Sequence, residues 1–215
     1  MNRLLLLDLD DTLCERPPIF REWAAAFLAD TGLPATVDDL VELDEGGHVT
    51  RRTFHQRLAD LGLGTSYDDF VGAHEAEVSG RYRLTDDASV ALDEARAAGW
   101  RLGIVTNGYE RRQSLKIAAS GLADRLDAVC ISQEAGVSKP DPAIFRLAAE
   151  RAGTTLDGAW MVGDNLDADI AGARNAGIGS VWVQRPREWL TFSSGAEPDL
   201  VAKDAADGVR QVLAL

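Results

Sequence analysis

The chain has few of the residues that would indicate a disulfide-stapled, membrane-embedded or nucleic-acid-binding protein. Only two of its 215 residues are cysteines, Cys14 and Cys130, so we expect reduced thiols and no disulfide framework. The apolar run at the N-terminus, residues 4–7, is too short for a signal peptide or a spanning helix. A net charge of −13 repels the phosphate backbone of nucleic acids. These absences predict a cytoplasmic protein with neither membranes nor nucleic-acid polymers as partners.

Short apolar segments alternate with helical segments through most of the chain. With 46% hydrophobic residues, a sizeable core can be buried. Strands are expected at 4–7, 101–106, 128–132, 159–162 and 180–183, with a further short apolar stretch at 199–201. Helices are expected at 86–98, 109–120, 142–153, 167–176 and 205–213. This alternation predicts an α/β fold, a doubly wound parallel sheet with helices on both faces.

Residues 19–80 have a different character. Four segments with helical spacing occur there, at 20–28, 38–43, 53–61 and 68–78, and no β-branched run interrupts them. We therefore expect an all-helical insertion after the first strand, with 15–83 as a cap domain and 1–14 with 84–215 as the core domain. Phe20 and Trp23 are expected in the core of this insertion, and His55 and His74 at or near its surface.

Polar residues follow the strands. Asp8, Asp10 and Thr12 follow the first strand, and the further sets are Thr106-Asn107-Gly108, Lys139-Pro140, and Gly163-Asp164-Asn165 with Asp167 and Asp169 close behind. Ligands of such sheets bind outside the carboxyl ends of the strands, where these residues are expected to converge. Asp167 is expected to cap the helix that begins beside it.

A cluster of carboxylates needs a cation. Two carboxylates about 4 Å apart repel each other by roughly 4 kcal/mol at an effective dielectric near 20. Asp8, Asp10, Asp164 and Asp169 all offer hard oxygen ligands, and these segments contain no histidine or cysteine. That donor set favours Mg²⁺ over zinc.

The four segments resemble, in order and spacing, the four motifs of the haloacid dehalogenase-like (HAD) hydrolase superfamily. The motifs are Asp8-Leu9-Asp10-Asp11-Thr12, Thr106-Asn107, Lys139-Pro140, and Gly163-Asp164 with Asp169. The resemblance covers essentially the whole chain and implies a Rossmann-like core, with the inserted helices as a C1-type cap. The wording of the motifs is similar to the nucleotidase and sugar-phosphate phosphatase branches.

The resemblance also implies residue roles. Asp8 would be the nucleophile on phosphorus, and Asp10 the general acid and then the general base. Mg²⁺ would be held by Asp8, the backbone carbonyl of Asp10, Asp164 and Asp169. Lys139 and Thr106, with the amides of Asn107 and Gly108, would bind the phosphoryl group. The implied activity is Mg²⁺-dependent hydrolysis of a small phosphorylated metabolite through an aspartyl-phosphate.

The cap is expected to set substrate choice, and the physiological substrate is not readable from the sequence. Its loop at 45–52 contains two glycines followed by His48 and Arg51, which are candidates for contacts with the substrate. A phosphomutase on the same core stays open as an alternative, as does a non-catalytic binding protein. Haloacid dehalogenation is disfavoured because those enzymes lack an acid at the position of Asp10 and need no metal.

Overall fold

The structure is a computed structural model of the chain and describes residues 3–47, 49–185 and 192–215. The chain divides into two compact units. One combines Met1–Cys14 with Arg83–Leu215, and the other is Glu15–Tyr82. The two units are called the core unit and the cap unit below, and each is described by itself.

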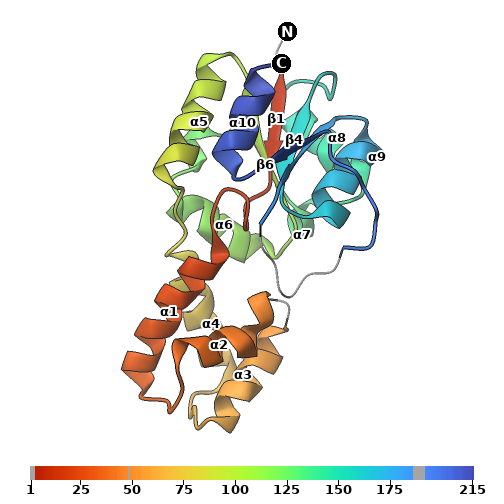
Figure 1. The fold of residues 1–215 in the computed structure, drawn as a ribbon. Helices are drawn as coiled ribbons and strands as arrows, with labels where there is room; N and C mark the ends of the chain where they lie inside the picture. Colours follow the sequence, from red (N-terminus) through yellow and green to blue (C-terminus); the bar gives the residue numbers. More distant parts are fainter. Residues whose placement is uncertain (1–2, 48, 186–191) are drawn as a thin grey trace. The chain divides into compact units, whose positions relative to one another are not determined.

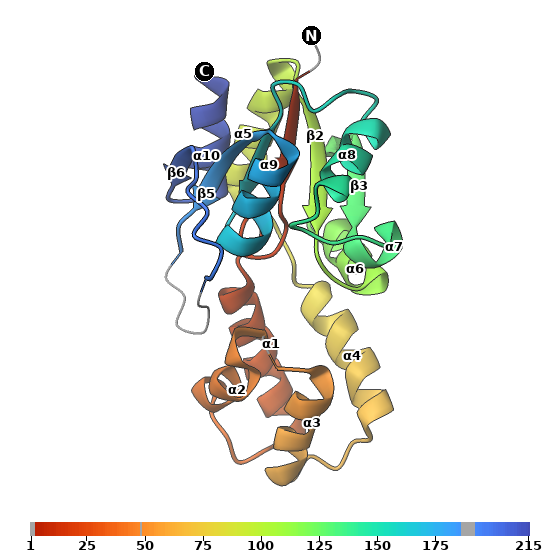
Figure 2. The same ribbon diagram turned by 90° about the vertical axis from the view of Figure 1, so that its right-hand side faces the viewer.

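The core unit contains a six-stranded parallel sheet with the order β3-β2-β1-β4-β5-β6 (Figure 2). The strands are β1 (Leu4–Leu7), β2 (Arg101–Thr106), β3 (Ala128–Ile131), β4 (Trp160–Gly163), β5 (Gly179–Val183) and β6 (Leu200–Ala202). The strand order reverses at β1, which lies between β2 and β4. A doubly wound sheet binds its ligands at such a reversal, so the fold places the end of β1 at the centre of the expected site. The predicted fold class is confirmed.

Helices cover both faces of this sheet (Figure 1). Helices α5 (Asp86–Ala97) and α10 (Ala205–Leu213) pack together on one face, and α8 (Pro142–Arg151) and α9 (Ala171–Ala176) on the other. The expected helix at 167–176 is divided, because a π-helical turn, η3 (Leu166–Ile170), precedes α9. The remaining helical elements described in the core unit are α6 (Glu110–Ala119), η2 (Ala123–Arg125) and α7 (Ser132–Ala135).

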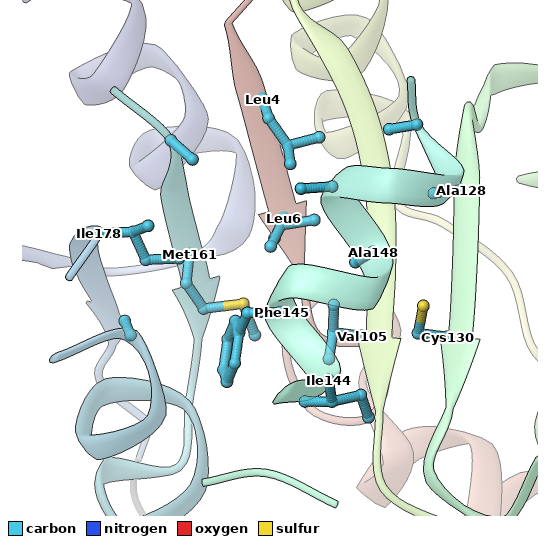
Figure 3. Close-up of a cluster of buried hydrophobic side chains, with 14 residues drawn as sticks. Leu4, Leu6, Val105, Ala128, Cys130, Ile144, Phe145, Ala148, Met161 and Ile178 are labelled. Atoms are coloured by element: carbon cyan, nitrogen blue, oxygen red, sulfur yellow. The ribbon is translucent and has the colours of Figure 1, made fainter. Parts of the chain in front are cut away.

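The core on one face of the sheet forms where β1 meets α8. All four leucines of β1 are fully buried, and alternate side chains of a strand point to opposite faces. Leu4 and Leu6 therefore face α8, where they join a cluster that includes Phe145 (Figure 3). Burial on both faces explains why β1 is apolar at every position, as expected for a parallel strand between helices.

The cap unit consists of helices and an aromatic core. Its elements are α1 (Arg16–Thr31), α2 (Val37–Asp44), η1 (Glu45–Gly47), α3 (Arg51–Asp60) and α4 (Tyr67–Ser79). Phe20 and Trp23 are buried, as predicted. The expectation for His74 was wrong: it is buried and stacks on Trp23 with ring centroids 4.4 Å apart, because α4 turns it toward α1. In the part of the chain that the structure describes, no helix is long and apolar enough to cross a membrane.

Candidate active site

The strand register brings three of the four sequence motifs together. Leu7 lies opposite Ile104 in β2 and Val162 in β4, so Asp8 leaves β1 between the ends of its two neighbours. The N–H of Asp8 extends the ladder and donates to the carbonyl of Val162 at 3.0 Å. Asp8 therefore has a fixed backbone and a buried side chain.

A tight turn follows Asp8, and its residue Thr12 contacts a second acid, Asp164. Asp11 occupies its left-handed position, at φ 58°, and donates its N–H to the carbonyl of Cys14 at 2.8 Å. The Thr12 hydroxyl donates to Oδ1 of Asp164 at 2.9 Å. Thr12 thus ties the turn after β1 to the end of β4, while Asp11 is a residue of the turn itself.

Lys139 links the nucleophile candidate to another acid. Its Nζ lies 2.7 Å from Oδ1 of Asp8, 2.7 Å from Oδ1 of Asp169 and 2.6 Å from the carbonyl of Val105. Burial lowers the pKa of Lys139, but the charges of Asp169 and Asp8 and the hydrogen bonds to them raise it above its ordinary value overall. Lys139 is therefore a buried ammonium group held between two carboxylates.

Asp169 can reach this position because position 163 carries no side chain. A methyl group on Gly163 would overlap the Asp169 side chain. The π-helical turn η3 points Asp169 back toward the sheet, and the N–H of Asn165 donates to its Oδ2 at 3.0 Å. The glycine of the last motif is thus required by close packing at the site.

The carboxylates of Asp8, Asp164 and Asp169 form a site that fits a divalent cation. Each offers one oxygen, and these three oxygens lie within 4.8 Å of one another. All three residues are buried, and hard oxygen donors in this number suit Mg²⁺, which keeps several waters and takes few protein carboxylates. The side chain of Asp10 lies outside this group, consistent with the expectation that its backbone carbonyl supplies the ligand.

The charge balance of the cluster also favours a cation. Burial raises the pKa of Asp8, the charge and hydrogen bond of Lys139 lower it, and the charges of Asp169 and Asp10 raise it, so that the pKa is about 7 overall. One lysine therefore does not keep the Asp8 carboxylate fully ionised at neutral pH. A bound cation would lower the pKa of Asp8 and leave it as a carboxylate, which is the form that can act as a nucleophile.

The segment after β2 is placed beside Lys139, but its groups already have partners. Thr106 is buried at the end of β2. The Asn107 side chain accepts from the N–H of Lys139 at 2.9 Å and donates to its carbonyl at 3.0 Å, which fixes the lysine loop. The N–H of Gly108 donates to the Ser132 hydroxyl at 2.9 Å. Phosphoryl binding by Asn107 and Gly108 stays a prediction, and for Gly108 it requires its N–H to exchange partners.

The expectation for Asp167 was wrong. Asn165 caps the helix, because its Oδ1 accepts from the N–H groups of Asp167 at 3.0 Å and Ala168 at 2.9 Å. The Asp167 carboxylate instead accepts from the N–H groups of Ser193 and Ser194. Hydrogen bonding by the Ser194 side chain and by these N–H groups lowers the pKa of Asp167 to about 2. Asp167 therefore anchors the segment that follows β5.

Two residues of the cap, Arg51 and His48, were expected to contact the substrate. Arg51 is the first residue of α3, and its Nη1 donates to Oδ1 of Asp44 at 2.9 Å. Arg16 approaches the other oxygen of Asp44 at 2.6 Å, so the fully buried Asp44 joins two arginines within the cap unit. His48 lies outside the described residues. Substrate contacts by Arg51 and His48 stay predictions.

Sequence reasoning missed two residues that contact Asp10. Lys116 Nζ lies 2.7 Å from Oδ1 and 2.8 Å from Oδ2 of Asp10, and Gln113 Nε2 lies 3.0 Å from Oδ2. A signal was present in the sequence. Gln113 and Lys116 are three residues apart in the helix that begins just after Gly108, and such a pair shares one helix face.

A buried aspartate paired with a lysine, beside carboxylates that could hold a cation at the carboxyl edge of a doubly wound sheet, is an arrangement typical of an enzyme. Residues 3–177 match the model of the haloacid dehalogenase-like hydrolase family. The chain belongs to this family, and the resemblance drawn from its motifs is confirmed.

Relatives named as phosphatases cover most of the chain. The phosphoserine phosphatase of Thermus thermophilus is 32% identical, over 85% of this chain and 89% of that protein. The glyceraldehyde 3-phosphate phosphatase of Methanopyrus kandleri is 41% identical, over 86% of this chain and 85% of that protein. Among solved structures, magnesium-bound YfnB from Bacillus subtilis has a TM-score of 0.76 at 22% identity, covering 100% of this chain and 99% of that one. This last similarity concerns the fold.

Proposed function

We propose that the protein is a Mg²⁺-dependent phosphatase that hydrolyses a small phosphate monoester through an aspartyl-phosphate on Asp8. The observation that carries the proposal is the buried cluster in which Asp8 shares Lys139 with Asp169 and lies within reach of a cation held with Asp164. A phosphate ester brings negative charge to this edge of the sheet. A cluster with a lysine and a cation can accept that charge.

In the first step Asp8 attacks phosphorus, and the bond between phosphorus and the leaving oxygen breaks. Asp10 donates a proton to that oxygen, so that an alcohol leaves. In the second step Asp10 accepts a proton from water, which attacks the phosphoryl group on Asp8 and releases phosphate. Two displacements on one aspartate thus require an acid and a base in turn, and Asp10 serves as both.

The other residues have supporting roles in this proposal. Asp8, Asp164, Asp169 and the carbonyl of Asp10 would hold Mg²⁺, which would neutralise charge between the nucleophile and the phosphoryl oxygens. Lys139 keeps Asp8 oriented and supplies a buried positive charge beside it. Thr106 would donate its hydroxyl proton to a phosphoryl oxygen.

The relatives indicate the class of substrate. They are named for phosphoserine and glyceraldehyde 3-phosphate, and a further relative from Halopiger xanaduensis, 31% identical, is a ribulose-1,5-bisphosphate 5-phosphatase. All of these substrates are small metabolites with a phosphate on a primary alcohol. We therefore propose a phosphorylated small metabolite of this kind as the substrate.

Turnover of p-nitrophenyl phosphate with and without Mg²⁺ tests the proposal. We expect hydrolysis that EDTA abolishes, and a loss of at least about 10³-fold in kcat for Asp8→Asn. Asp124→Asn, at an exposed aspartate of the core unit, is the matched control and should retain activity. Absence of Mg²⁺-dependent turnover with a broad panel of phosphate esters would refute the proposal. Transfer of the phosphoryl group between two positions of a sugar would favour a mutase instead.

A further inference from the structure

Helix α6 carries two buried polar residues that the mechanism above does not use. Gln113 is 1% exposed and Lys116 is 7% exposed. Lysine is rarely so buried without a partner, because removing an ammonium group from water is costly. Their three-residue spacing puts both on the same face of the helix. The partners of Gln113 and Lys116 therefore indicate what this face of α6 does.

Both residues contact the carboxylate of Asp10. Lys116 lies within 2.8 Å of both of its oxygens, and Gln113 donates to one of them at 3.0 Å. The Lys116 side chain is 8% exposed and that of Asp10 is 28% exposed, so water screens this ion pair less than a pair on the open surface. The contacts thus fix the carboxylate in one orientation from one side.

Gln113 also connects Asp10 to Thr106. Its Nε2 lies 2.6 Å from Oγ1 of Thr106, where the hydroxyl oxygen is the acceptor. A hydroxyl that accepts from an amide retains its own proton to donate elsewhere. A methyl group on Gly108 would lie 3.0 Å from Cγ of Gln113, so the glycine after β2 leaves room for this side chain.

We propose that Gln113 and Lys116 are positioning residues for phosphoryl transfer, an inference that rests on the proposed function. Lys116 and Gln113 hold Asp10 in the orientation that delivers its proton to the leaving oxygen. Gln113 additionally sets the Thr106 hydroxyl as a donor toward the phosphoryl group. A purely structural role for Gln113 and Lys116, anchoring α6 to the core, would not require contacts with the side chains of Asp10 and Thr106 in particular.

The dependence of rate on the leaving group separates the two roles. An alkyl alcohol needs protonation as it leaves, whereas p-nitrophenolate leaves without it. The parameter to compare is kcat/KM, because it reports on the steps up to transfer of the phosphoryl group to Asp8. The test measures it for p-nitrophenyl phosphate and for glycerol 3-phosphate with Mg²⁺, and forms the aryl-to-alkyl ratio for each variant.

Lys116→Met removes the charge and keeps the apolar stem. We expect the aryl-to-alkyl ratio to rise about 10- to 100-fold, within the range that general acid catalysis contributes. Lys116→Arg, which retains a cation, should restore part of the loss. Gln113→Met leaves the ion pair in place and should raise the ratio about 2- to 10-fold, as for the loss of one hydrogen bond. Ser114→Ala, on the exposed face of α6, is the matched control and should leave the ratio unchanged.

A double-mutant cycle with Asp10→Asn completes the test. If Lys116 acts through Asp10, then Lys116→Met should change the ratio little in the Asp10→Asn background. Equal losses for both substrates in Lys116→Met and Gln113→Met, or a full effect of Lys116→Met without Asp10, would overturn the inference. If Lys116→Met does not fold, the aryl-to-alkyl ratio of Gln113→Met decides between a positioning role and a purely structural one. Failure of the wild-type enzyme on the broad panel of phosphate esters would instead refute the proposed function, and the inference with it.

Discussion

Replacing Gly163 with alanine should disrupt the cation site without changing any charged residue. A methyl group at this position would lie 2.5 Å from Cβ of Asp169, about 1 Å inside the usual carbon–carbon contact of 3.5–4.0 Å. Gly163 is the last residue of β4 and pairs with Trp182 of β5, so its backbone is restrained by the sheet. Asp169 must therefore move away.

The displacement has a cost that follows from the contacts of Asp169. A shift of about 1 Å away from these partners would stretch its 2.7 Å contact with Lys139 and its 3.0 Å hydrogen bond from Asn165 beyond hydrogen-bonding distance. Breaking a buried pair by removing one partner costs about 3–5 kcal/mol. We expect about 3 kcal/mol in the free energy of unfolding, because Lys139 keeps its contacts with Asp8 and Val105. Affinity for Mg²⁺ should fall about 10- to 100-fold, as for other changes next to metal ligands.

Two measurements check this expectation. Urea unfolding in EDTA gives the change in the free energy of unfolding, and calorimetric titration with Mg²⁺ gives the affinity. Gly72→Ala in α4 is the control, since a methyl group there meets no atom within 4 Å and alanine favours a helix. A Gly163→Ala protein with wild-type stability and wild-type Mg²⁺ affinity would show that Asp169 is not held as described.

Three further predictions concern other parts of the molecule. In EDTA, Asp8 should make the protein less stable as the pH rises from about 4 to about 7, because the native state keeps a proton on Asp8 that the unfolded chain has lost. Urea unfolding of wild type and Asp8→Asn isolates the contribution of Asp8 to the free energy of unfolding. A difference between the two proteins that does not change with pH would contradict the prediction. Cys14 and Cys130 are buried, and burial raises the pKa of both thiols, that of Cys14 to about 12. A thiol reagent at pH 8 should therefore react with neither cysteine until urea is added. Prompt reaction of the native protein would show that a thiol is accessible. Asp44→Ala should destabilise the cap unit by about 3–5 kcal/mol, because it leaves the partly buried Arg51 and Arg16 without their shared carboxylate. Equal unfolding midpoints for variant and wild type would show that the ion pairs of Asp44 add no stability.

The alternation of short apolar runs with helical segments was enough to predict the sheet, because burial on both faces leaves a parallel strand little choice of residue. β2 was predicted to the residue, and the helices of the cap unit were found within a few residues of their ends. The grouping of Asp8, Asp164 and Lys139 was also readable, since parallel strands end at one edge of their sheet. Local spacing and topology alone produce these features.

Only the tertiary structure decided which buried side chains meet. Gln113 and Lys116 lie more than 100 residues from Asp10 in the chain, so no local pattern joins them. The same holds for Asp167, whose partners come from the segment after β5 and not from its own helix. Sequence by itself determined the fold and which acidic and basic residues follow the strands, because both depend on residue types at regular spacings. Tertiary packing decided the partner of each charge, because a buried charge is stabilised by whichever group the fold brings within hydrogen-bonding distance.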